Sequence, residues 1–133
     1  MAPTITDRPE MQGYGVEDDL DGVLPWEWAV ERLVGSRSYW VVTASADGRP
    51  HAMPVWGVWR PDHDEYWFSR APTARKVRNL AANDRITVTT EDPTRFVSLE
   101  GRAERVEAGP RIEPVLGDYG GKYAEFADGT AEE

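Results

Sequence analysis

Residues 68–85 read FSRAPTARKVRNLAANDR, and the fold is expected to be built around this stretch. The whole sequence has 24 acidic and 15 basic residues, yet residues 66–83 contain no Asp or Glu. The cations in the same window are Arg70, Arg75, Lys76 and Arg78. A cationic segment within an acidic protein predicts a binding site for an anion.

Within this stretch, a helix is expected at residues 73–82, with Thr73 as its N-cap. The residues expected to be buried recur at helical spacing: Ala74, Val77, Leu80 and Ala81. The polar residues that lie off this stripe are Arg75, Lys76, Arg78 and Asn79. The pattern therefore predicts a helix with an apolar buried face and a cationic outer face.

The start of this helix is the predicted phosphate site. A helix N-terminus has unpaired N–H groups and the positive end of the helix dipole, and both favour phosphate. Arg75 and Lys76 in the first turn disfavour the isolated helix by about 0.3–1 kcal/mol each. A bound phosphate would remove this conflict, whereas the alternative is a solvated basic face.

On both sides of the helix the sequence has the pattern of strands. Strands are expected at residues 39–44, 51–59, 65–69, 85–90 and 96–106. Asp47 and Gly48 predict a hairpin turn between the first two strands. Pro54 indicates a bulge or a side free of ladder hydrogen bonds in the second strand. Gly57 indicates a bulge or a close approach by another group.

The remaining segments predict two helices and an irregular arm. Residues 25–35 form the first helix, because Pro25 suits a first helical position and Gly35 suits the position after the last turn. Residues 110–126 are expected to be helical in part, since three glycines weaken the helix. Strands separated by tight turns predict a mainly β protein whose antiparallel sheet of six or so strands closes into a small barrel. One domain is expected, with residues 1–24 as an N-terminal arm and residues 25–133 as the barrel.

Composition excludes several classes of function. The net charge of −9 opposes nucleic-acid binding. No apolar run approaches the roughly 20 residues of a membrane span, and residues 1–10 lack the apolar core of a signal peptide. The absence of cysteine excludes disulfides and thiol chemistry, and two histidines do not predict a metal site. These features predict a soluble cytoplasmic protein.

Four pieces of sequence together carry a family resemblance. They are DGRPHAMPVWGVW (residues 47–59), EYWFSR (65–70), TARKVRNLAANDRITV (73–88) and VSLEGRAERV (97–106). Their order and spacing resemble the pyridoxamine 5′-phosphate oxidase-like FMN-binding split β-barrel superfamily, over residues 25–126. Within it, the sequence is most similar to the small reductases that depend on the deazaflavin coenzyme F420.

The resemblance implies a homodimer of split barrels, with each cofactor in a groove at the subunit interface. It implies that the ring system lies against Met53, Pro54, Val55 and Trp56. It places the phosphate end near Ser69, Arg70, Arg75, Lys76 and Asn79. Relatives usually continue from the C-terminal helix into another long strand, which residues 124–133 do not resemble.

The implied activity is hydride transfer from reduced F420 to an unsaturated small-molecule acceptor. F420 carries a phosphate and a polyglutamate tail, and Arg49 and Arg78 would extend the cationic track for that tail. The alternatives are an FMN-dependent enzyme of the pyridoxamine-phosphate oxidase type and a non-catalytic flavin or deazaflavin carrier; haem binding is disfavoured. No catalytic residue is assigned; His51 is a candidate proton donor, with an ordinary strand residue as the alternative. Trp56, Tyr119 and Tyr123 are the aromatic residues expected on the substrate side.

Overall fold

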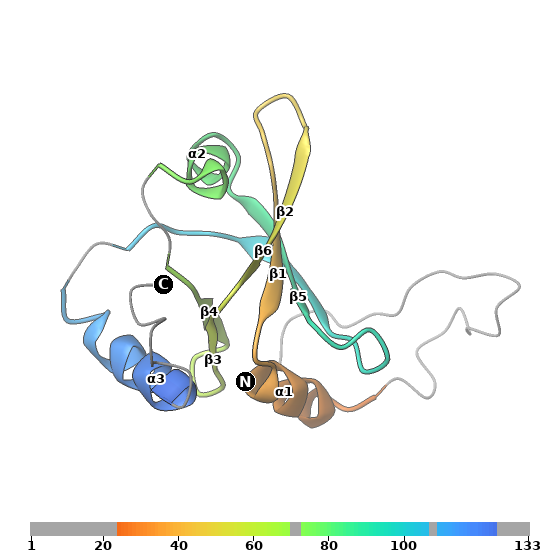
Figure 1. The fold of residues 1–133 in the computed structure, drawn as a ribbon, viewed down its shortest axis with the longest axis vertical. Coiled ribbons are helices and arrows are strands. Elements are labelled where there is room, and N and C mark those ends of the chain that lie inside the picture. The colour runs from red at the N-terminus through yellow and green to blue at the C-terminus, as the bar shows by residue number, and fades with distance from the viewer. Residues whose placement is uncertain (1–23, 70–72, 107–108, 125–133) are drawn as a thin grey trace, which may run out of the picture.

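The computed structural model describes residues 24–69, 73–106 and 109–124, in which strands and helices follow the expected order (Figure 1). The helices are α1 (Trp26–Gly35), α2 (Arg75–Ala82) and α3 (Glu113–Tyr123). The strands are β1 (Tyr39–Ala44), β2 (Pro50–Val55), β3 (Val58–Arg60), β4 (Glu65–Trp67), β5 (Arg85–Thr90) and β6 (Ser98–Arg102). In this part of the chain all strand pairs are antiparallel, which confirms a mainly β protein.

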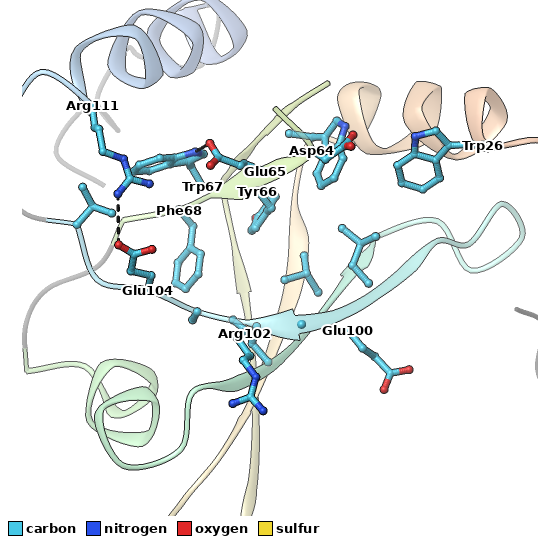
Figure 2. Close-up of a pocket in the computed structure, with 17 residues that line it drawn as sticks. Trp26, Asp64, Glu65, Tyr66, Trp67, Phe68, Glu100, Arg102, Glu104 and Arg111 are labelled. Carbon is cyan, nitrogen blue, oxygen red and sulfur yellow. Dashed lines mark hydrogen bonds and ion pairs between the residues drawn. The ribbon is translucent and has the colours of Figure 1, made fainter. Parts of the chain in front are cut away.

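Among the described residues the strands pair in two antiparallel sheets, and their closure into the expected barrel stays a prediction. One sheet has the order β2-β1-β5-β6, and β3 pairs only with β4 in the other. Among the described residues, the edges of β4 and β6 remain unpaired with each other. A pocket of about 430 Å³ lies between these two strands, as Figure 2 shows.

The predicted strand at residues 51–59 is in fact two strands, β2 and β3, which belong to different sheets. The break falls at Trp56 and Gly57, and its cause is a close approach. A Cβ atom on Gly57 would lie 2.0 Å from the hydroxyl oxygen of Tyr66, so only glycine fits there. Pro54 is tolerated because β2 is an edge strand, where a missing N–H costs little.

The core lies on one face of the four-stranded sheet. Its fully buried members come from three strands: Tyr39, Val41, Val55 and Val88. A second cluster of Leu33, Trp59 and Val97 joins α1 to the two-stranded sheet. On the opposite face of the large sheet, Trp40 of β1 pairs with Pro54 of β2, and Trp40 is 45% exposed.

The other boundaries differ from expectation at particular residues. β6 ends at Arg102, well short of residue 106, although the N–H of Ala103 just beyond it donates a 2.8 Å hydrogen bond to the carbonyl of Asp84. α3 is continuous despite its three glycines, because Val115 and Tyr123 are buried and the helix packs on β3. Packing of a buried face outweighs weak helix propensity. The predicted arm at residues 1–24 lies outside the described residues, except for Leu24.

None of the helices in the described segments is both long and apolar enough to cross a membrane.

Candidate functional site

The most buried residues of α2 are polar. Lys76 is 5% exposed and Asn79 is 8% exposed, whereas Ala81 is exposed. The Asn79 amide Nδ2 donates a hydrogen bond of 3.0 Å to Oγ1 of Thr43, which is itself buried on β1. Of the predicted buried stripe, Ala74, Val77 and Leu80 are half-buried and Ala81 is exposed, while the hydrogen bond to Thr43 compensates the burial of Asn79.

The first turn of α2 is suited to an anion. The N-cap is Ala74 rather than the predicted Thr73, and no side chain caps the helix. The first turn holds no acidic residue, while Arg75 is exposed and Lys76 is buried. Because uncapped N–H groups and the helix dipole both favour negative charge, a cation buried at this end adds to the same attraction.

His51 lies at the α2 end of β2. Its backbone is opposite Thr43 in the register of β1 and β2, and Thr43 is bonded to Asn79. Nδ1 of His51 is buried and has no hydrogen-bond partner, which is uncommon for a buried polar atom. The structure therefore groups His51, Thr43, Lys76 and Asn79 around the contact of α2 with β1.

The predicted ring contacts follow β2 toward its other end. Met53 is 41% exposed and Pro54 is also exposed, so both are accessible to a ligand. Val55 is 2% exposed and belongs to the core, so its side chain faces away from any ligand on the outside of β2. Trp56 is half-buried and stacks on Tyr123 of α3, with ring centroids 4.4 Å apart and planes within 4°.

The C-terminal end of α3 meets the break between β2 and β3. Lys122 Nζ donates hydrogen bonds to the hydroxyl of Tyr39 (2.6 Å) and to the carbonyl of Gly57 (3.0 Å). Burial lowers the pKa of Lys122 to about 8, although the carboxylate of Glu91 acts in the opposite direction. Burial also raises the pKa of Tyr123 to about 12.

Sequence reasoning did not identify Thr43 or Lys122 as site residues. Both residues gain their significance from partners far along the chain, so local patterns gave no signal for Thr43. Lys122 is one of only two lysines in the sequence, which is the one signal that pointed to it. Of the predicted residues, Ser69 is exposed and Arg70 lies outside the described residues.

The pocket between β4 and β6 lies away from this cluster. Its wall is rich in aromatic residues, which Figure 2 labels in part: Trp26, Tyr66, Trp67 and Phe68. Arg111 lies at its edge, in an ion pair of 3.3 Å with Glu104 and over the ring of Trp67. None of the described residues predicted to contact a cofactor lines this pocket.

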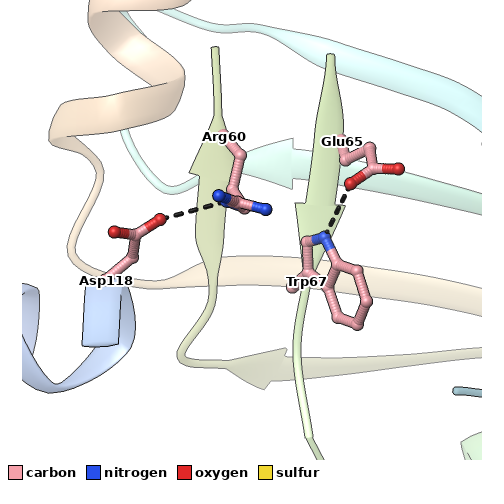
Figure 3. Close-up of polar contacts among 4 residues, drawn as sticks. All are labelled: Arg60, Glu65, Trp67 and Asp118. Carbon is pink, nitrogen blue, oxygen red and sulfur yellow. Dashed lines mark hydrogen bonds and ion pairs between the residues drawn. The ribbon is translucent and has the colours of Figure 1, made fainter. Parts of the chain in front are cut away.

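Polar contacts fix the two-stranded sheet beside α3. Arg60 of β3 forms an ion pair of 3.1 Å with Asp118 of α3, and Trp67 Nε1 donates to Glu65 within β4 (Figure 3). These contacts hold α3 against β3. In the described ranges, no group of three or more His, Cys, Asp or Glu side chains has the arrangement of a metal site.

Comparisons with known proteins agree with this fold. The haem storage protein HutZ from Vibrio cholerae is 24% identical, with a TM-score of 0.61, over 78% of this chain and 76% of HutZ. A conserved hypothetical protein from Mycobacterium tuberculosis is 25% identical, with a TM-score of 0.69, over 81% of this chain and 69% of its own. A structure described as an F420 reductase is 22% identical, with a TM-score of 0.55, over 71% of this chain and 75% of its own.

A search of curated proteins gave no significant match. Residues 27–133, by contrast, match the family described as pyridoxamine 5′-phosphate oxidase, and this match spans most of the chain. It includes both the polar cluster at α2 and the junction of α3 with β3. The chain therefore belongs to the pyridoxamine 5′-phosphate oxidase family.

Proposed function

We propose that the protein is an oxidoreductase that binds a phosphate-bearing flavin-type cofactor, with coenzyme F420 as the preferred form. The observation that carries the proposal is the burial of Lys76 in the first turn of α2. A cation at the positive end of a helix, together with the N–H groups of the first turn, favours an anion at that point. Asn79 and Thr43 hold this face of α2 against β1 through their 3.0 Å hydrogen bond.

The surface of the protein fits a cofactor that extends from α2 along β2. His51 is at the α2 end of β2 and Trp56 follows the other end, five residues away. At a strand rise of about 3.4 Å per residue, this separation is about 17 Å. Between them, Met53 is 41% exposed on the face of β2 that also carries His51, so a planar ring can lie against it, whereas Pro54 is exposed on the opposite face beside Trp40.

A reduced deazaflavin supplies a hydride, so the chain itself has to bind, orient and shield the reactants. Arg75 and Lys76 would hold the phosphate, while Met53, on the same face of β2 as His51, would support the ring. Exposed Arg78 and Arg49 extend the positive charge beyond the phosphate. This extension supports F420, whose anionic tail is longer than the phosphate end of FMN.

The partner proposed for this chain is a second copy of itself. The support comes from the exposed face of the large sheet, where Trp40 is 45% exposed beside Pro54. A large exposed aromatic residue within an apolar patch is typical of an interface. A cofactor on β2 would then lie at the edge of the contact between two subunits.

The cofactor is tested by titration with F420, FMN and haem, followed by cofactor fluorescence for the first two and by absorbance for haem. F420 is expected to bind at least tenfold more tightly than FMN, which corresponds to about 1.4 kcal/mol. Equal affinity or a preference for FMN would assign FMN, rather than F420, as the cofactor. The family and a neighbour described as FAD-binding support this alternative. Preferential haem binding would instead indicate a haem protein, as several neighbours are described.

The phosphate site is tested by Lys76→Ala. This change is expected to weaken cofactor binding by tenfold or more, because the buried cation closest to the phosphate is lost. Arg95→Ala is the matched control, since it removes an exposed cation from the turn between β5 and β6. If both variants bind equally well, or if Lys76→Ala only unfolds the protein, Lys76 has a structural role.

Turnover is tested separately, because a carrier would bind the cofactor without using it. Reduced F420 is mixed with the protein and a panel of quinones and enones in a stopped-flow instrument. Acceptor-dependent oxidation of the cofactor is expected. Its absence across the panel would assign the protein as a carrier.

A further inference from the structure

The C-terminal helix is attached to the point at which the chain crosses from one sheet to the other. Trp56 and Gly57 form this crossing between β2 and β3. The last two residues of α3, Lys122 and Tyr123, contact it by stacking and by hydrogen bonds.

Tyr123 contacts both residues of the crossing. Its ring lies flat on the indole of Trp56, at 4.4 Å and within 4° of parallel. Its hydroxyl accepts a 3.0 Å hydrogen bond from the N–H of Gly57, and it lies 3.0 Å from the carbonyl of Gly57 and 2.6 Å from that of Arg37. Stacking fixes the plane of the indole, and the hydrogen bonds fix the backbone from which the indole projects.

The crossing is confined from the opposite side as well. The space where a Cβ of Gly57 would lie is filled by the ring and hydroxyl of Tyr66, the nearest atom being 2.0 Å away. Lys122 adds a 3.0 Å hydrogen bond to the carbonyl of Gly57. The backbone at Gly57 is thus held between Tyr66 and the end of α3, and Trp56 has little freedom to reorient.

From this geometry we infer that Tyr123 is a positioning residue for the ring end of the cofactor site. It fixes the indole of Trp56, and Trp56 in turn sets the orientation of the planar ring system or of an aromatic acceptor beside it. This inference rests on the proposed function, which places the ring at the Trp56 end of β2. It adds α3 to the site, since α3 contains none of the residues assigned to cofactor binding.

The inference predicts a division of effects between the two ends of the site. Loss of Tyr123 alters the environment of the ring and the KM for the acceptor, while the phosphate remains held at α2. Loss of Lys76 weakens binding of the whole cofactor but leaves the spectrum of the bound ring unchanged. A purely structural role for Tyr123 would lower thermal stability and change nothing else.

The test compares three variants of the full chain. Tyr123→Leu removes the stack and the hydroxyl, Tyr123→Phe keeps the stack, and Val115→Ala is the control. Val115 is 6% exposed on the same helix, so its truncation weakens helix packing without touching Trp56. Tm, cofactor affinity, the fluorescence spectrum of bound F420 and the KM for an acceptor are measured for each.

Tyr123→Leu is expected to shift the fluorescence of the bound cofactor and to raise the acceptor KM at least fivefold, whereas Val115→Ala lowers Tm alone. Tyr123→Phe is expected to have an acceptor KM between those of the other two variants. Its bound cofactor is expected to show the fluorescence spectrum seen with the wild type. If Tyr123→Leu changes the spectrum and KM no more than Val115→Ala does at a similar Tm, the positioning role is refuted while the cofactor assignment stands. If the wild-type protein binds neither F420 nor FMN, the proposed function fails and the inference fails with it.

Discussion

Lys122 makes the stability of the protein rise with pH, whereas its tyrosine partners make the stability fall with pH. Burial lowers the pKa of this ammonium from 10.5 to about 8. Between these two pH values the unfolded chain holds a proton that the folded chain has released. Stability therefore rises with pH across this window, because the cost of burying the charged form disappears.

The size of the effect follows from the shift. A change of about 2.5 pKa units corresponds to at most about 3.4 kcal/mol, at 1.36 kcal/mol per unit. Lys122 is only partly buried, and solvent screening reduces the expected gain to about 1 kcal/mol. Burial raises the pKa of both Tyr39 and Tyr123, so the folded state keeps these protons longer and stability falls again above pH 10.

The assay is urea unfolding at pH 7.5 and pH 9.5 for the wild type and for Lys122→Met. Between these two pH values, the free energy of unfolding is expected to rise by about 1 kcal/mol more for the wild type than for the variant. Arg111→Met is the control, because it removes another cation, from the segment just before α3. An equal change for wild type and Lys122→Met would refute the assignment of a depressed pKa to Lys122.

Two further predictions concern buried contacts of the site. Thr43→Val removes the acceptor of the Asn79 amide and is expected to cost about 1–3 kcal/mol of unfolding free energy, measured in urea; a loss below 0.5 kcal/mol would show that the amide finds another partner. Gly57→Ala forces a methyl group onto Tyr66 and is expected to lower stability by about 1–3 kcal/mol. An unchanged Tm for Gly57→Ala would mean that the crossing relaxes freely.

The strands were predictable from sequence where each is regular along its length. β1 and β5 have the expected bounds, because β-branched and aromatic residues dominate both. The strand at residues 51–59 was mispredicted, although Pro54 and Gly57 marked it as irregular. A local pattern shows that glycine is needed but not that Tyr66, nine residues further on, fills the space beside it.

The orientation of α2 was not predictable from hydrophobic spacing. Spacing counts apolar residues as buried, whereas Lys76 and Asn79 are both buried, and Asn79 finds a polar partner in Thr43 on the sheet. The contact of Trp56 with Tyr123 was equally hidden, since it joins residues more than 60 positions apart. Residue types led to the phosphate end as a hypothesis, but only the fold shows which side chains share a face.

The outer edge of β2 limits how two copies of the protein can associate. Pro50 and Pro54 belong to this edge strand, and neither has an N–H group to donate. An incoming strand would find an interrupted ladder, so continuous pairing of β2 with β2 of another molecule is disfavoured. Association of two copies must therefore proceed by packing of side chains across the sheet face, which leaves the strand edge open to solvent and protects the protein from growth into extended β-aggregates.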